Sequence, residues 1–268
     1  MNNLRNNFIN TIQLGKCEYL IPQLPNNFVD IMITSPPYNV DLGNNKYNKN
    51  KYDIHNDAMD HQTYIKQLRN IFASLYPKMV SGGRVCINVG DGKNGSIPTH
   101  SDIIQFMTKD LDYLLKTTII WEKCQIGNRT SWGSYMSPHN PSFPTPFEYI
   151  LIFCKESYSK QGRKEDITIS KDEFIKNSLA IWRLRPESEM NSKYGHPAMF
   201  PLSLPMRLIQ SLSYKNDIVL DIFSGAGTTC LAAAMLSRRW IGFEKSKKYV
   251  QTAQQRLNKY LNQNRIFN

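Results

Sequence analysis

The chain has 268 residues, of which 41% are hydrophobic, and its formal net charge is +11. This length allows one large α/β domain with insertions and a sizeable buried core. No run approaches the roughly 18 consecutive apolar residues of a membrane span, and residues 1–7 contain no apolar signal core, so we expect a cytoplasmic protein with no membrane partner.

The five cysteines stand far apart and form no C-x-x-C pair. An odd, scattered set inside apolar runs indicates reduced, buried thiols, and we therefore expect no metal. The positive charge suits a polyanionic partner such as nucleic acid. A lysine- and asparagine-rich composition equally reflects an AT-rich genome, so the charge only supports other observations.

The first elements predicted are a strand, a turn and a helix over 14–24, followed by a second strand. The apolar run 29–33 is short and β-branched, and residues 34–39 after it read TSPPYN. This pattern predicts a buried strand that stops abruptly. Each proline fixes φ near roughly −65° and lacks an N–H, so the loop is stiff and turns outward.

This loop presents groups that suit a flat nucleobase with an exocyclic amine. Backbone carbonyls and the Ser35 hydroxyl accept hydrogen bonds from an NH2 group, and the Tyr38 ring offers a stacking face. For an isolated motif, a proline turn with a surface tyrosine is an equal alternative.

The polar stretch 40–60 has no periodicity, which predicts a mobile loop. Lys46 and Lys49 lie in it, directly after the proline loop, so we expect them to contact nucleic acid; a solvated insert is the alternative. An apolar stripe then predicts a helix over 60–77.

A strand over 84–89 ends at Gly90-Asp91-Gly92. Because an acid at the carboxyl end of a strand faces the ligand crevice of an open α/β sheet, Asp91 is a candidate active-site acid. A turn-forming aspartate between glycines is the alternative. A helix around 103–111 and a strand over 115–121 follow.

Segment 123–145 contains too many prolines for a regular element. Arg129 and Trp132 there, with Tyr135, suit a nucleic-acid groove through charge and stacking, although a loop pinned by aromatic burial fits equally. A strong buried strand spans 147–153.

Residues 157–178 read as a small, exposed, basic insertion, and a second basic cluster follows at 182–185. Exposed basic side chains suit base and phosphate contacts, while a solvated face is the alternative. The candidates for DNA contact in this region are Arg163, Lys164, Arg183 and Arg185.

A helix over 201–213 and a buried strand over 218–223 lead to a glycine loop and an alanine-rich helix. The loop lacks the lysine of a phosphate-binding P-loop. The next strand ends at Glu244, about 20 residues further on, where a ribose-binding carboxylate belongs. A nucleoside cofactor without a phosphate cradle fits S-adenosylmethionine (AdoMet) better than NAD. A basic amphipathic helix over 246–261 ends the chain.

Together these motifs make the chain resemble the β-class DNA amino-methyltransferases of restriction–modification systems, which include N4-cytosine and N6-adenine enzymes. The loop at 34–39 resembles their catalytic [D/N/S]-P-P-[Y/F] motif, residues 196–208 a cofactor-side motif, and residues 221–229 (DIFSGAGTT) the AdoMet loop. The catalytic motif precedes the cofactor loop, which is the β-class order.

The resemblance implies a doubly wound, mostly parallel seven-stranded α/β sheet with one antiparallel strand. It implies a catalytic half over 1–155, a small target-recognition insertion over 156–195 and an AdoMet half over 196–268. The catalytic residues implied are Ser35, Pro36, Pro37, Tyr38 and Asp91. The cofactor-binding residues implied are His196, Asp221, Phe223, Ser224, Gly225, Gly227, Thr228 and Glu244.

It further implies a bacterial or archaeal enzyme that flips a base out of duplex DNA and methylates its amine directly. Serine at the first motif position favours N4 of cytosine, and N6 of adenine is the alternative. A DNA-binding subunit without catalysis is an alternative from another class. A homodimer and a cognate restriction endonuclease are open as further partners.

Overall fold

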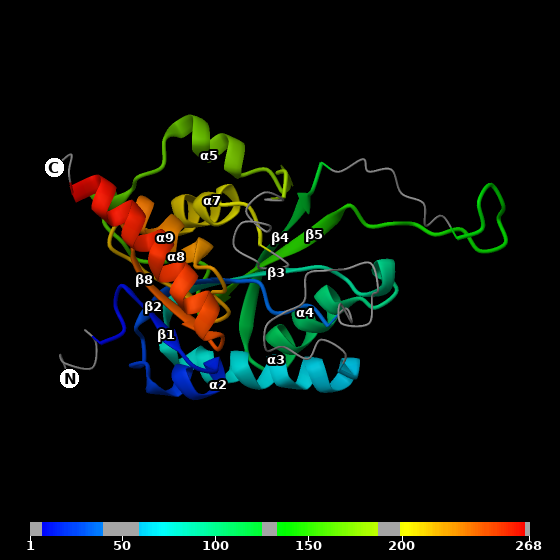
Figure 1. The fold of residues 1–268 in the computed structure, drawn as a ribbon, viewed down its shortest axis with the longest axis horizontal. Coiled ribbons are helices and arrows are strands. Elements are labelled where there is room, and N and C mark those ends of the chain that lie inside the picture. The colour runs from blue at the N-terminus through cyan, green and yellow to red at the C-terminus, as the bar shows by residue number, and fades with distance from the viewer. Residues whose placement is uncertain (1–6, 40–58, 125–132, 187–198, 266–268) are drawn as a thin grey trace.

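The computed structural model describes residues 7–39, 59–124, 133–186 and 199–265. One sheet with the strand order β1-β8-β7-β2-β3-β5-β4-β6 forms its centre (Figure 1). The strands are β1 (Thr11–Leu14), β2 (Val29–Thr34), β3 (Met79–Val89), β4 (Tyr113–Glu122), β5 (Phe147–Lys155), β6 (Ile181–Arg183), β7 (Ile218–Asp221) and β8 (Arg239–Glu244).

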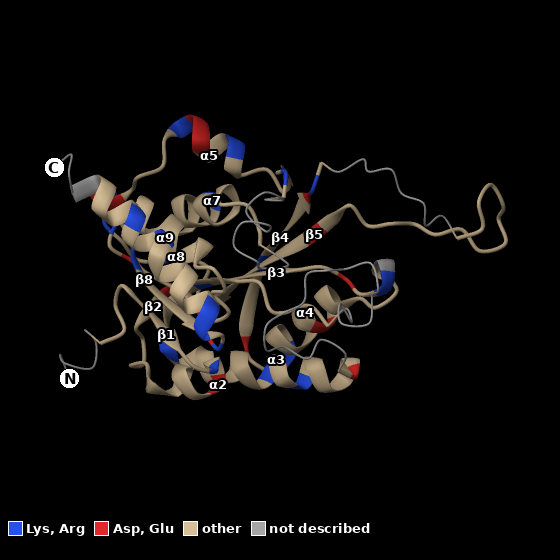
Figure 2. Cartoon of the chain, viewed as in Figure 1, with Lys and Arg blue, Asp and Glu red and all other residues tan. Residues whose placement is uncertain are grey.

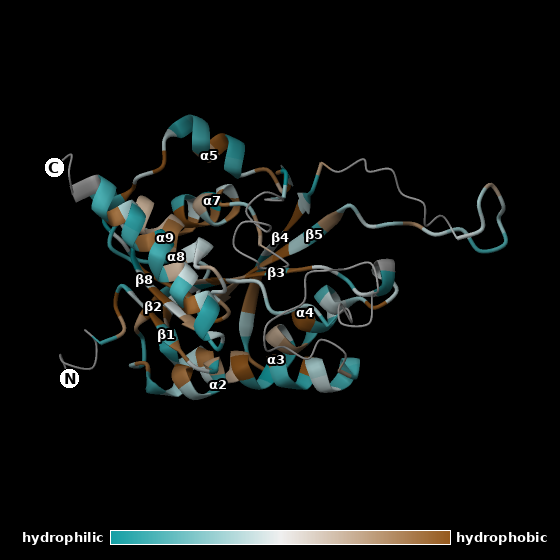
Figure 3. Ribbon diagram, viewed as in Figure 1, coloured by the Kyte–Doolittle hydropathy of each residue, from teal (hydrophilic) through white to brown (hydrophobic). Residues whose placement is uncertain are grey.

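Helices cover both faces of this sheet. One face carries α2 (Cys17–Leu20), α3 (His61–Leu75) and α4 (Thr99–Lys109), and the other carries α7 (Ser203–Leu212), α8 (Thr228–Met235) and α9 (Lys247–Arg265). Two separate groups of buried apolar side chains fill the layers between helices and sheet, and the hydrophobic colouring of the central strands follows them (Figure 3). The predicted doubly wound α/β fold is confirmed.

Strand directions also follow the expectation. Among the described strands, β5 alone runs antiparallel to both of its neighbours, and every other pair is parallel. The carboxyl ends of β2, β3, β7 and β8 and the amino end of β5 therefore lie at one edge of the sheet. In an open α/β sheet this is the edge where ligands bind.

The sheet has eight strands rather than the expected seven. The extra strand is β6, which pairs in parallel with β4 and whose sequence we interpreted as an exposed basic cluster. Trp182 explains the difference: it is 2% exposed, and its indole N–H donates to the Asn177 carbonyl. Burial of this large aromatic fixes the short strand at the edge of the sheet.

The segment between β5 and β6 contains a short helix, α5 (Lys171–Asn177). Ser170 and Glu173 form a capping box at its start, in which each side chain accepts from the backbone N–H of the other residue. Residues 133–146, which precede β5, project from the body as an arm. No helix in the described ranges is long and apolar enough to cross a membrane.

Candidate active site

The proline loop leaves the sheet at Thr34, beside the end of β7. The Thr34 hydroxyl donates to Asp221 Oδ1 at 2.7 Å, and both side chains are buried. This bond joins the loop that follows β2 to the strand that precedes the glycine loop. Two motifs that lie far apart in the sequence are thereby held side by side.

Tyr38 is the centre of a polar network behind the proline loop. Its hydroxyl donates to Glu148 Oε2 at 2.7 Å and accepts from the Ser35 hydroxyl at 3.0 Å. Asn88 Nδ2 lies 2.9 Å from the Tyr38 hydroxyl and 2.7 Å from Glu148 Oε2. The ammonium of Lys123 pairs with the other carboxylate oxygen, Glu148 Oε1, at 2.5 Å.

Sequence reasoning missed Glu148, Asn88 and Lys123 as site residues, although the first two carried a signal. Each interrupts an apolar run that predicts a buried strand, and each is nearly fully buried in the structure. Because a buried polar group without a hydrogen-bond partner costs folding free energy, its presence in such a strand points to a network.

The glycine loop turns β7 into α8. Gly225 and Gly227 have φ values of 49° and 77°, in the left-handed region that favours glycine. A Cβ atom at Gly227 would lie 2.8 Å from Ala253 Cβ, so α9 also restricts this position to glycine. The loop backbone is therefore exposed to the adjacent cavity without side chains at these two points.

Two acids lie beside the loop. Burial raises the pKa of Asp221 to about 6, although the Thr34 hydroxyl and the Phe223 N–H donate to it. Burial also raises the pKa of Glu244, whose two oxygens accept the backbone N–H groups of Gly225 at 2.9 Å and Ser246 at 2.8 Å. A carboxylate accepts about four hydrogen bonds, so Glu244 retains acceptor capacity for a ligand.

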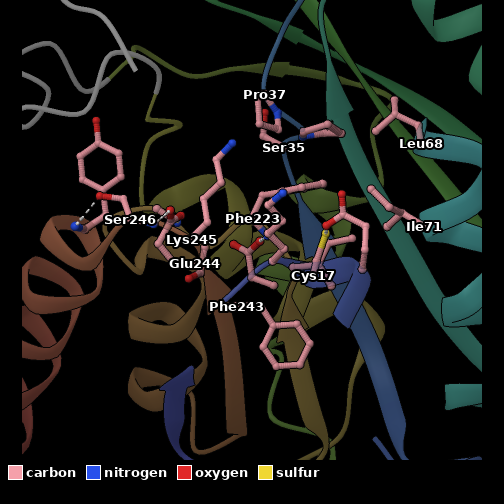
Figure 4. Close-up of a pocket in the computed structure, with 18 of the residues that line it drawn as sticks. Cys17, Ser35, Pro37, Leu68, Ile71, Phe223, Phe243, Glu244, Lys245 and Ser246 are labelled. Carbon is pink, nitrogen blue, oxygen red and sulfur yellow. Dashed lines mark hydrogen bonds between the residues drawn. The ribbon is translucent and has the colours of Figure 1, made fainter. Parts of the chain in front are cut away.

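These elements enclose a cavity of about 270 Å³. Figure 4 shows Ser35 and Pro37 on one side of it, Phe223 and Glu244 across from them, and Leu68 and Ile71 from α3 along another wall. The turn between β1 and α2 contributes Gly15 and Lys16, and α2 contributes Cys17, whose thiol pKa is raised by burial. The sequence analysis assigned no role to α3 or to this turn.

The cavity walls fit a nucleoside cofactor. The Ser224 hydroxyl is buried and has no hydrogen-bond partner among the described residues, so it has capacity for a ligand. The side-chain-free glycine turn allows close backbone approach, and Glu244 offers free acceptor sites at the end of β8. Apolar Phe223 and Ile222 line the same space and suit a planar ring.

Asp91 lies away from the cavity lining. Its carboxylate accepts from His100, at 2.8 Å from the imidazole Nδ1 and at 3.1 Å from the backbone N–H, where α4 begins. The His100 ring in turn stacks on Tyr149 at 3.8 Å between centroids. The structure thus gives Asp91 a partner at the start of α4.

The expected DNA contacts fall into two groups. Arg183 and Arg185 are exposed and lie at the carboxyl end of β6, on the same edge as the cavity, with Arg183 paired to Glu122 at 3.0 Å. Arg163 and Lys164 lie at the opposite edge, because Asp166 beside them accepts from the Lys215 N–H just before β7. His196, Lys46, Lys49, Arg129 and Trp132 lie outside the described residues.

Among the described residues, no group of three or more His, Cys, Asp or Glu side chains forms a potential metal site. A glycine loop with an acid on the following strand, opposite a proline loop whose serine lines the same cavity, is typical of Rossmann-like methyltransferases. Comparison with known proteins identifies the family within this class.

The family model described as DNA methylase, for N6 and N4 methyltransferases, matches residues 29–255. The type II methyltransferase M.MjaVI of Methanocaldococcus jannaschii is 33% identical over 71% of this chain and 94% of its own length. M.MjaI of the same organism is 31% identical over 84% of both chains. The chain belongs to the N6/N4 DNA methylase family.

Solved structures agree with this assignment. TTHA0409 of Thermus thermophilus, described as a candidate DNA modification methylase, is 27% identical with a TM-score of 0.72, covering 93% of this chain and 94% of that one. A further structure of TTHA0409 is complexed with S-adenosyl-L-methionine. The cytosine-N4-specific PvuII methyltransferase has a TM-score of 0.67 over 91% of this chain and 85% of that one; at 19% identity it supports the fold alone.

Proposed function

We propose that this DNA amino-methyltransferase methylates N4 of cytosine in duplex DNA after flipping the base out of the helix. The observation that carries the proposal is the position of Ser35, Pro36 and Pro37, which face the glycine loop across one cavity. A base held by the proline loop and a cofactor held by the glycine loop would meet in this cavity. Membership of the family supports the reaction class, and the choice of base is the proposed part.

AdoMet is the cofactor, and when bound it supplies a methyl group on a sulfonium, which is the electrophile of the reaction. Glu244 would accept from the ribose hydroxyls, and the Gly225–Gly227 turn would lie against the nucleoside. The buried Ser224 hydroxyl would gain the partner that it lacks among the described residues. His196 is proposed as a further contact from the sequence motif.

The target base would lie over the proline loop. The Ser35 hydroxyl already donates to Tyr38, so its lone pairs remain to accept a hydrogen bond from the base amine. The Pro36 carbonyl would accept the second amine hydrogen, and the Tyr38 ring would stack on the base and offset part of the unstacking cost. Holding the amine in line with the methyl group is the main rate contribution that this geometry offers.

The assignment to cytosine rests on Ser35. A neutral hydroxyl at this position resembles N4-cytosine enzymes more often, whereas an aspartate would add negative charge near the amine. N6 of adenine is the alternative within the family, and a DNA-binding subunit without catalysis is the alternative outside it. A homodimer and a cognate restriction endonuclease are separate hypotheses, tested by the mass of the protein in solution and by restriction of unmethylated DNA.

Nucleoside mass spectrometry of unmethylated DNA, incubated with the protein and AdoMet, tests the proposal. The expected product is N4-methylcytosine. N6-methyladenine would refute the choice of base, and no methylated base would favour the non-catalytic alternative. Ser35→Ala separates these outcomes further, because it should abolish turnover in an enzyme and leave a DNA-binding subunit unchanged.

A further inference from the structure

We propose that Glu148 is the final proton acceptor of the reaction, reached from the target amine through the hydroxyls of Ser35 and Tyr38. This inference rests on the proposed function and assigns a role in it to a residue of β5 that neither the sequence motifs nor the family match singled out. Asp91 is held differently: its carboxylate accepts from His100, whereas Glu148 accepts from Tyr38 in the proline loop.

The donors in this network point in one direction. The Ser35 hydroxyl donates to the Tyr38 oxygen at 3.0 Å, and the Tyr38 hydroxyl donates to Glu148 Oε2 at 2.7 Å. Asn88 donates to both the Tyr38 oxygen and Glu148, and the Tyr38 hydroxyl donates to the carboxylate. The one group that accepts without donating onward is Glu148, so a proton that enters at Ser35 leaves at the carboxylate.

The proton balance closes along this path. Methyl transfer forms a bond between the amine nitrogen and the methyl carbon and breaks the bond between that carbon and sulfur, which leaves a positive charge on the amine. The amine then gives a proton to Ser35 Oγ, Ser35 gives its own to Tyr38, and Tyr38 gives its own to Glu148 Oε2. The methylated amine, both hydroxyls and the protonated Glu148 are then neutral, and no further reactant is needed.

The surroundings of Glu148 hold its carboxylate in place before the reaction. The residue is only 6% exposed, and its charge is balanced by Lys123, which lies at the end of β4. The titratable groups that contact Glu148 in the described part of the chain are Tyr38 and Lys123. A carboxylate held by donors from three elements needs no rearrangement when the proton arrives.

Glu148→Gln and Tyr38→Phe test the relay. Glutamine keeps an acceptor oxygen but accepts no proton, and phenylalanine keeps the stacking ring but removes the hydroxyl. The measurement is the single-turnover rate of methylation of unmethylated genomic DNA between pH 5 and pH 9, together with the dissociation constants for AdoMet and DNA. Glu156→Gln is the matched control, because Glu156 follows the other end of β5 and is about half exposed.

We expect both variants to lose at least about 100-fold in rate, as for removal of a general base, while both dissociation constants stay within about twofold. The wild-type rate should fall at low pH, because an acceptor that already carries a proton takes up no other, and this acid limb should be missing from Glu148→Gln and intact in Glu156→Gln. The relay would be refuted if Glu148→Gln kept the wild-type rate and pH profile. It would also be refuted if the variant lost as much affinity for AdoMet or DNA as it lost in rate. Either result would leave the proposed function intact. A wild-type protein that methylates no base would overturn the proposed function itself.

Discussion

Polar side chains inside apolar strands mark the site at the scale of single residues. Asn88, Glu148 and Asp221 each lie within or at the end of a buried strand, and each is hydrogen-bonded. Burying such groups costs folding free energy that an apolar side chain would not. Their positions at one edge of the sheet therefore make sense as part of a site for reaction and binding.

Tyr38 and Glu244 should separate base binding from cofactor binding. Tyr38→Ala removes the stacking ring and the relay hydroxyl, and we expect it to lower methylation at least about 100-fold with little effect on AdoMet affinity. Glu244→Ala removes a charged acceptor, which is worth about 1.5–3 kcal/mol, so AdoMet should bind about 10- to 100-fold more weakly. Isothermal titration and single-turnover rates measure the two effects, and the opposite pattern would refute our placement of base and cofactor.

Asp221 makes stability depend on pH with a defined sign. Burial raises its pKa from 3.8 in the unfolded chain to about 6 in the folded protein. Between these values the folded state binds more protons, so the free energy of unfolding falls as pH rises from about 4 to about 6. Between about pH 4 and about pH 6 the free energy of unfolding falls by about 3 kcal/mol.

Asp221→Asn should remove this dependence, because its amide oxygen still accepts from Thr34 and Phe223 but does not ionise. We expect the variant to be more stable than the wild type above about pH 6 and the difference to shrink towards pH 4. Urea unfolding of both proteins across this range is the measurement. A constant difference at all pH values would mean that burial of the charge is not its cause.

At the scale of secondary-structure elements, the start of α8 depends on backbone conformation. Gly227 is the N-cap of α8 with φ of 77°, and packing by α9 leaves no room for a methyl group there. Gly95 also has a positive φ, of 90°, but a Cβ at that position would lie 3.4 Å from the nearest atom, Thr145 Cγ2. The two glycines thus share the conformational requirement and differ in packing.

We expect Gly95→Ala to cost about 1–2 kcal/mol for the left-handed conformation. Gly227→Ala should cost this amount plus about 1–3 kcal/mol for overpacking, and it should also weaken AdoMet binding. Thermal unfolding with and without AdoMet measures both effects. Equal losses of stability in the two variants would contradict the overpacking cost, because they would mean that α9 shifts to accommodate the methyl group at position 227.

At the scale of the whole molecule, charge is distributed unevenly over the surface. Figure 2 shows Lys and Arg on the helices and on the segment around α5, while residues 133–146 of the projecting arm carry no charged side chain. Arg183 and Arg185 are described basic residues on the cavity edge, and Arg163 and Lys164 lie on the other edge. Only the first of these two pairs shares the edge of the sheet with the cavity.

DNA affinity should therefore fall steeply with salt, and Arg183→Ala/Arg185→Ala should reduce the slope. Each phosphate contact contributes about 0.9 to the slope of log affinity against log salt concentration, so the double variant should lose up to about 2. Arg163→Ala/Lys164→Ala should leave the slope unchanged, contrary to the sequence-based expectation for these residues. Fluorescence anisotropy with labelled DNA between low and moderate salt measures the slope for both double variants. A DNA affinity that does not change with salt concentration would contradict phosphate contacts by these basic residues.

Local patterns were sufficient to predict the fold class and the two principal motifs. An apolar run that ends at two prolines is a strand followed by a stiff loop, and an apolar run followed by G-A-G and alanines is a strand, a turn and a helix. These conclusions need only neighbours in the chain, because φ restriction and periodicity act within a few residues. The order of the two motifs then identified the family without further information.

Only the tertiary structure decided which side chains meet. Thr34 and Asp221 bond across 187 residues of chain and Tyr38 and Glu148 across 110, and Asp91, equally well placed in the sequence, turns to His100 instead. Burial of Trp182 fixes residues 181–183 as an eighth strand, although their sequence resembles an exposed basic cluster. Such pairings depend on strand order and on the antiparallel direction of β5, which are properties of the packed sheet and leave no trace in a local stretch of sequence.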